Sequence, residues 1–109
     1  MFVSGWGESF KPTVANKMTA EAYKESVKLL TQIPGIGRAI ADDLIQMGIT
    51  SIGQLKNKDA EKLYAKSNKQ CGTVQDRHLL YVFRCAIYFA SNETHDPEKL
   101  KWWNWKDGV

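Results

Sequence analysis

The chain has 109 residues, of which 43% are hydrophobic and 25% are charged, and its formal net charge at pH 7 is +3. These values are ordinary for globular proteins, so they exclude a chain that is disordered throughout, and the length suits one domain rather than two. The longest apolar stretch, residues 79–90, is interrupted by Arg84 and too short to span a bilayer, and no apolar leader follows the first methionine. We therefore predict a cytoplasmic protein that does not enter a membrane. Its mild positive charge permits a nucleic-acid partner without requiring one.

The first helix is predicted after an irregular arm. Residues 1–18 contain glycine, proline and aromatic residues without a period, and we expect them to form an arm outside the domain of residues 19–107. Thr19 is suited to cap a helix over residues 20–31. The apolar positions of this helix are expected to form a buried stripe: Ala22, Tyr23, Val27 and Leu30.

A tight turn between two helices is the sharpest pattern in the chain. Pro34 ends the first helix, and Gly35 can adopt a backbone conformation that a side chain disfavours. Gly37 and Arg38 open a second helix, whose apolar residues keep helical spacing: Ile40, Ala41, Leu44 and Ile45. The first N–H groups of this helix have no intrahelical acceptor and lie at its partially positive end, so they can bind a phosphate. Both glycines leave these groups accessible.

The spacing of apolar residues and glycines in this turn resembles the helix-hairpin-helix motif. The resemblance implies sequence-independent binding to the backbone phosphates of duplex DNA through five residues: Gly35, Ile36, Gly37, Arg38 and Ala39. In related hairpins a monovalent cation can be held by carbonyls, which correspond here to those of Thr31, Ile33 and Ile36. Such motifs also serve as adaptors that bind a protein or a second copy of the same chain. Asp42 and Asp43 favour this alternative, because they give residues 30–48 a net charge of −1.

A short third helix is predicted after the second. Gly48 fits a left-handed cap that ends the second helix. Thr50 or Ser51 can then cap a helix in which Ile52 and Leu55 face inward.

The fourth helix, capped by Asn57 or Asp59 and ending near Gln70, carries a row of lysines. They recur at spacings of four, four and three residues: Lys58, Lys62, Lys66 and Lys69. One interpretation is a solvated helix face. The other is a supporting basic face beside Arg38, which would steepen the logarithmic dependence of DNA affinity on salt from a slope of about −1 or −2 to about −4.

Residues 75–91 are apolar on nearly every side and are predicted to form the central core helix, with Thr73 and Asp76 as a capping box. Four residues break the apolar pattern along one stripe: Arg77, Tyr81, Arg84 and Tyr88. They could contact nucleic acid, but we favour arginines that pair with carboxylates such as Asp42, Asp43 or Asp76.

The C-terminal residues are predicted to fold back over the core. Asp96 and Pro97 fit a helix start, and three tryptophans follow: Trp102, Trp103 and Trp105. So much aromatic surface is costly to leave in water, although an aromatic patch for a partner is the alternative.

The runs at residues 76–88 and 100–105, together with the hairpin, resemble the bacterial pathogenicity-locus family of small helix-hairpin-helix proteins, some of which carry a mitomycin-resistance label. The resemblance extends from about Thr19 to Asp107. The hairpin region is also similar to the C-terminal domains of bacterial competence regulators. Neither resemblance implies a demonstrated catalytic activity, and each links the chain to DNA only by association.

Catalytic and metal chemistry find little support in the sequence. The chain is too short for the two lobes of a base-flipping glycosylase, and it has no Gly-rich nucleotide loop. Its metal-ligating residues are spaced seven, seven and ten apart, which matches no common zinc site: Cys71, His78, Cys85 and His95. We therefore predict a non-enzymatic protein without a cofactor, a transition metal or a small-molecule substrate. Its fold is expected to be all-α, with about five helices in one domain.

Overall fold

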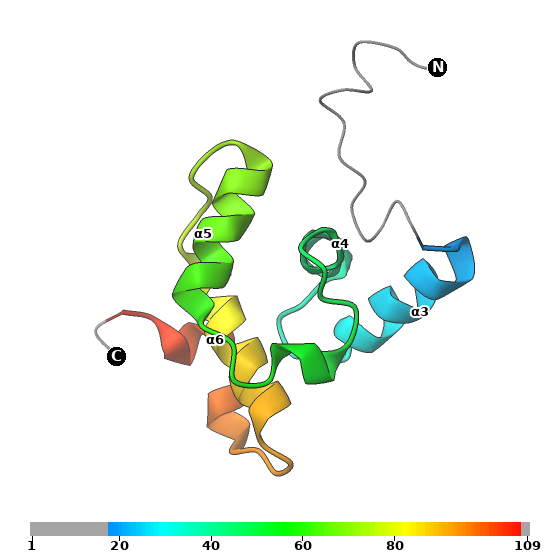
Figure 1. Cartoon of the computed structure of the whole chain (residues 1–109). Helices are drawn as coiled ribbons and strands as arrows, with labels where there is room; N and C mark the ends of the chain where they lie inside the picture. Colours follow the sequence, from blue (N-terminus) through cyan, green and yellow to red (C-terminus); the bar gives the residue numbers. More distant parts are fainter. Residues whose placement is uncertain (1–17, 108–109) are drawn as a thin grey trace, which may run out of the picture.

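The computed structural model describes residues 18–107, which form α-helices and 3-10 turns and no strand (Figure 1). The α-helices are α3 (Ala20–Leu30), α4 (Arg38–Gln46), α5 (Ala60–Cys71) and α6 (His78–Ser91). The 3-10 turns are η1 (Ile52–Leu55), η2 (Pro97–Leu100) and η3 (Trp102–Trp105). The predicted all-α class is thus confirmed, with four α-helices and three shorter turns in place of about five helices. The predicted arm lies outside the described residues, apart from Met18.

None of the helices between residues 18 and 107 is long and apolar enough to cross a membrane.

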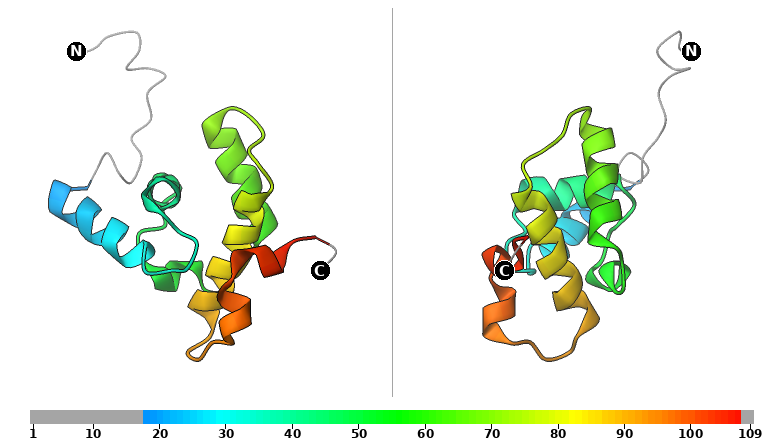
Figure 2. Two further views of the ribbon diagram at one scale, coloured as in Figure 1. Left: turned by 180° about the vertical axis from the view of Figure 1, so that it is seen from behind. Right: turned by 90° about the vertical axis from the view of Figure 1, so that its left-hand side faces the viewer.

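The start of α3 is as predicted, but its buried stripe differs. The hydroxyl of Thr19 accepts a hydrogen bond from the N–H of Ala22, which caps the helix. The helix ends at Leu30, one residue earlier than expected, and Ala22 is exposed while Ser26 is buried. The reason is visible in Figures 1 and 2: α3 lies at one end of the described part and packs against α4, so only a narrow stripe of α3 is covered.

The turns after α4 follow the sequence pattern closely. Gly48 has a φ of +90°, as a left-handed helix end requires. Ser51 caps η1 and forms a capping box with Gln54, and Leu55 is buried. Asp59, rather than Asn57, caps α5.

The predicted start of the core helix was wrong by three residues. α6 begins at His78, not at Gln75, and Thr73 and Asp76 do not form a capping box; the carboxylate of Asp76 accepts the N–H of His78 instead. The cause is tertiary, because the N–H and the carbonyl of Gln75 both form hydrogen bonds with side chains of α5. These bonds keep the segment before α6 from joining the helix.

The core is organised around α6, as its apolar sequence predicts. This helix contacts α5, η1, η2 and η3. Leu80, Phe83 and Ala86 are fully buried, and together with Leu30, Leu44 and other apolar side chains they form one continuous cluster. Figure 2 shows α6 crossing the molecule between α5 and the C-terminal turns.

The C-terminal segment folds back on α6, as predicted, and one carboxylate holds it. Asp107 accepts hydrogen bonds from Arg77 at 2.6 Å and forms an ion pair with Arg84 at 2.9 Å. Arg84 also donates to the carbonyl of Trp105 and pairs with Glu61. The prediction that these arginines pair with carboxylates is confirmed.

The predicted partners of the arginines, however, were wrong. None of Asp42, Asp43 and Asp76 pairs with Arg77 or Arg84. Sequence spacing did not reveal the partner, because the fold brings Asp107 to the arginines from thirty residues beyond Arg77.

The pKa of Asp107 gives a test of its ion pairs with Arg77 and Arg84. Its hydrogen bonds with Arg77 and then Arg84 hold the pKa of the carboxyl below its ordinary value of 3.8. A group with a lowered folded-state pKa stabilises the fold above its unfolded pKa and loses that contribution as the pH falls through the folded value. We expect the Tm of the wild-type protein to decrease as the pH is lowered below about 4. The Tm of Asp107→Asn should be lower at neutral pH and should decrease less on acidification. Thermal unfolding between pH 2 and pH 7, followed by tryptophan fluorescence, measures both.

The matched control is Glu93→Gln, which removes an exposed carboxylate that forms no ion pair among residues 18–107. It should leave the acid dependence unchanged. If the Tm of Asp107→Asn depended on pH as the Tm of the wild type does, the stabilising role of these ion pairs would be contradicted.

Candidate functional site

The connection between α3 and α4, residues 31–37, is a tight turn that is anchored in the core by apolar side chains. Leu30, Ile33 and Ile36 are buried in the core. The N–H of Ile36 donates to the carbonyl of Ile33 at 3.0 Å and closes the turn. The buried side chains fix the turn, so its outer surface is a rigid part of the protein.

The two glycines of this turn, Gly35 and Gly37, differ in whether the fold requires glycine at their position. Gly35 has a φ of +89°, and a Cβ atom there would lie 3.3 Å from Cδ1 of Trp102. Both its conformation and its packing therefore require glycine. Gly37 has a φ of −92° and a ψ of −176°, which any residue can adopt, and a Cβ atom there would meet nothing within 4 Å. The fold itself does not require glycine at position 37.

The first backbone N–H groups of α4 are free beside Gly37. Gly37 is the N-cap of the helix but offers no side chain to cap it. Within residues 18–107, no acceptor receives the N–H groups of Arg38, Ala39 or Ile40. These groups lie at the positive end of the helix dipole and need an acceptor from solvent or from a ligand.

Four of the five predicted phosphate-binding residues therefore lie together on the surface. Gly35, Gly37, Arg38 and Ala39 are exposed. Ile36 differs, because its side chain is buried and its N–H is already used within the turn. Its part in the site is to anchor the turn.

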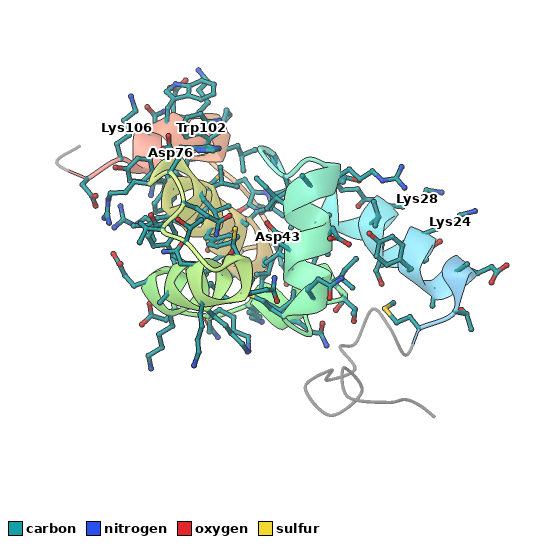
Figure 3. The ribbon with its side chains drawn as sticks, turned by 90° about the horizontal axis from the view of Figure 1, so that it is seen from above. Lys24, Lys28, Asp43, Asp76, Trp102 and Lys106 are labelled. Atoms are coloured by element: carbon teal, nitrogen blue, oxygen red, sulfur yellow. The ribbon has the colours of Figure 1, made fainter. Side chains whose placement is uncertain are left out.

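A basic cleft adjoins the free N–H groups. It has a volume of about 270 Å³ and is lined by residues of α3 and by the first residue of α4: Tyr23, Lys24, Val27, Lys28 and Arg38. Figure 3 shows the labelled Lys24 and Lys28 side by side on the outer surface of α3. No ion pair within the described part of the chain involves the three cations of this cleft.

Lys24 and Lys28 were not among the predicted phosphate-binding residues. A usable signal was present, because two lysines one helical turn apart, on the helix that precedes the turn, lie on one side of that helix. The structure adds these two lysines to Arg38.

Of the two acidic residues of α4, Asp42 lies beside the cleft, because it contacts Tyr23, whereas Asp43 lies toward α5. The carboxylate of Asp42 accepts a hydrogen bond from the hydroxyl of Tyr23, which raises the pKa of that tyrosine. Burial, and then the charge of Asp42, raise the pKa of Asp43. The carbonyl of Asp43 accepts a bond from Gln70 of α5, so Asp43 lies toward α5 rather than toward the cleft (Figure 3).

The predicted supporting lysines lie elsewhere. Lys62, Lys66 and Lys69 are exposed along α5, but Lys58 precedes the Asp59 cap and lines a separate cleft with Arg84 and other residues of α6. The predicted single row of four lysines was therefore wrong.

The lysines of α5 also do not line the cleft that contains Arg38. Figures 1 and 3 show α5 on the opposite side of α4 from α3. In Figure 3 the side chains of α5 that end in nitrogen point toward the lower edge, away from Lys24 and Lys28. α4 thus lies between α5 and the helix that carries Lys24 and Lys28.

The possible metal ligands can be located as well. The carbonyl of Ile33 already accepts the N–H of Ile36, and a cation held by it with Thr31 and Ile36 stays a prediction. Within residues 18–107 no three histidine, cysteine or carboxylate side chains gather as a metal site would require. Cys71 is exposed, whereas burial raises the pKa of the Cys85 thiol to about 11.

Comparison with known proteins gives one match. The family model described as "Pathogenicity locus" matches residues 23–108, which is most of the chain and includes the whole turn and the C-terminal tryptophans. The comparisons with curated proteins and with solved structures gave no match.

The contrast between the two glycines can be tested with the same substitution at each. Gly35→Ser places a side chain in a left-handed conformation against Trp102, and we expect it to lower the free energy of unfolding by about 1–3 kcal/mol. Gly37→Ser adds a side-chain cap to α4 and should be neutral or stabilising by a few tenths of a kcal/mol. Urea denaturation of the two variants measures the difference. Equal destabilisation by both would show that the fold also requires glycine at position 37.

Proposed function

We propose that this chain, which belongs to the pathogenicity-locus family, binds duplex DNA through backbone phosphates at a helix-hairpin-helix motif. The observation that carries the proposal is the glycine at position 37, which the fold does not need. It lies beside N–H groups and three cations that have no acceptor or ion-pair partner within residues 18–107. We further propose that the chain acts by binding alone, without catalysis.

The chemistry of this surface suits a phosphate diester. The free N–H groups of Arg38, Ala39 and Ile40 can donate to phosphate oxygens, and the helix dipole favours the negative charge. Lys24 and Lys28 line the same cleft as Arg38, the first residue of α4, and add positive charge there. A side chain at Gly37 would stand between the phosphate and the N–H groups, which gives a functional reason for glycine there.

The proposed binding is independent of sequence. Contacts from N–H groups and ammonium groups to phosphates carry no information about the bases. The surface offers no projecting helix with side chains to enter the major groove, because α4 meets the ligand with its end. We therefore expect moderate affinity that is similar for all duplexes.

The alternative is an adaptor that binds a protein or a second copy of the chain. Its support is the aromatic surface beside the hairpin, where Trp103 is 49% exposed next to Trp102. Sedimentation velocity over a dilution series separates self-association from a monomeric DNA binder.

A charge reversal at the N-cap separates folding from binding. In Gly37→Asp the new carboxylate caps α4 and should raise the free energy of unfolding by a few tenths of a kcal/mol. The same carboxylate occupies the proposed phosphate position, so we expect the affinity for a duplex to fall at least about tenfold, or about 1.4 kcal/mol. Fluorescence anisotropy with a labelled duplex measures the affinity.

The matched control is Gly53→Asp in η1, where a Cβ atom also meets nothing within 4 Å and where the charge change is the same. This variant should bind DNA almost as the wild type does. A folded Gly37→Asp protein with unchanged DNA affinity would exclude the proposed site.

The salt dependence of binding counts the cations that contact DNA. Three cations at the cleft predict a logarithmic slope of about −3, and Lys24→Gln/Lys28→Gln should reduce it to about −1. Because the α5 lysines do not line the cleft, Lys62→Gln/Lys66→Gln should leave the slope for one short duplex nearly unchanged. If only the α5 pair flattens the slope, the cleft is not the contact surface.

A further inference from the structure

We propose that the exposed lysines of α5 form a second DNA-binding surface, so that one molecule can hold two duplex segments. This surface, the α5 lysine face, consists of Lys62, Lys66 and Lys69. The inference rests on the proposed function, since the first segment is the one bound at the hairpin.

The charge of the α5 lysine face is not neutralised by its own helix. The carboxylate of Asp59 accepts the N–H groups of Glu61 and Lys62 as the helix cap. Glu61 pairs with Arg84 at 3.1 Å. Glu61 is thus paired with an arginine of α6, the Asp59 carboxylate stays at the cap of α5, and no ion pair between residues 18 and 107 includes a lysine of this face.

The spacing of the three lysines matches a polymer of phosphates. They recur at four and three residues and so lie along one side of the helix. At 1.5 Å per residue they cover about 10 Å, the length of about three base-pair steps at 3.4 Å each. A straight row of this length can follow a DNA strand.

The composition of the face favours a duplex over a protein or a membrane. The large apolar residues of α5, Leu63 and Tyr64, are buried on its other side. A helix that binds a membrane surface needs an exposed apolar face, and the apolar face of α5 is buried in the core. Lysine is also depleted in protein–protein interfaces. Phosphates of nucleic acid need only the exposed charge.

The placement of the two surfaces makes them separate. Lys24, Lys28 and the start of α4 lie on one side of the molecule, and the nitrogen-ended side chains of α5 point away from them (Figure 3). Because α4 lies between α3 and α5, the cleft and the α5 lysine face belong to different parts of the surface, and the α5 lysine face is available to a second segment.

A bridging experiment tests the inference with the full chain. One duplex of mixed sequence is fixed to beads, and capture of a second, fluorescent duplex is measured at protein concentrations where sedimentation shows a monomer. We expect the wild-type protein to capture the second duplex. Lys62→Gln/Lys66→Gln/Lys69→Gln should lower capture at least about fivefold while its affinity for a single duplex stays within about twofold. The charge-retaining variant Lys62→Arg/Lys66→Arg/Lys69→Arg should capture as the wild type does.

The outcomes distinguish the two proposals. If the wild type binds one duplex but captures no second, or if the glutamine variant captures equally well, the second surface is excluded and the hairpin proposal stands. If Gly37→Asp binds normally while the glutamine variant loses all binding, the hairpin proposal fails and bridging fails with it. Binding of the wild type to vesicles with anionic lipid, lost in the glutamine variant while bridging is absent, would assign the α5 lysine face to membranes and overturn the inference.

Discussion

The left-handed backbone at Gly35, covered by the side chain of Trp102, is the constraint on which the arrangement of this protein depends. It reverses the chain between α3 and α4 while Ile33 and Ile36 stay in the core on either side of it. With the turn fixed in this way, α4 begins at the surface with its first N–H groups uncovered. The same contact ties the C-terminal segment to the hairpin, so the two ends of the domain stabilise one turn.

Charged side chains are distributed unevenly over the surface of the protein. Two carboxylates, Asp107 and Glu61, pair with the arginines of α6. The lysines of the cleft and of the α5 lysine face form no ion pair among the described residues. A modest net charge of +3 can therefore coexist with two basic surfaces, because these carboxylates are paired with arginines rather than with the lysines.

Local patterns predicted most of the helices, whereas contacts between distant residues decided what was missed. The caps Thr19, Ser51 and Asp59 and the helix end at Gly48 depend on neighbouring residues alone, so they could be found in the sequence. The start of α6 and the partner of its arginines depend on α5 and on the C-terminal segment, which no local pattern describes. The same limit applies in part to the site: the spacing of Lys24 and Lys28 places them on one side of α3, but only the packing of α3 against α4 brings that side beside Arg38.

The contact between Gly35 and Trp102 also has a consequence for biosynthesis. The two residues are separated by roughly two thirds of the chain, so the contact has a high sequence separation and cannot form early. During translation α3 and α4 leave the ribosome long before Trp102 does, and their shared turn remains uncovered on that side until Trp102 has emerged. The two helices must therefore hold their turn through Ile33 and Ile36 alone during this interval.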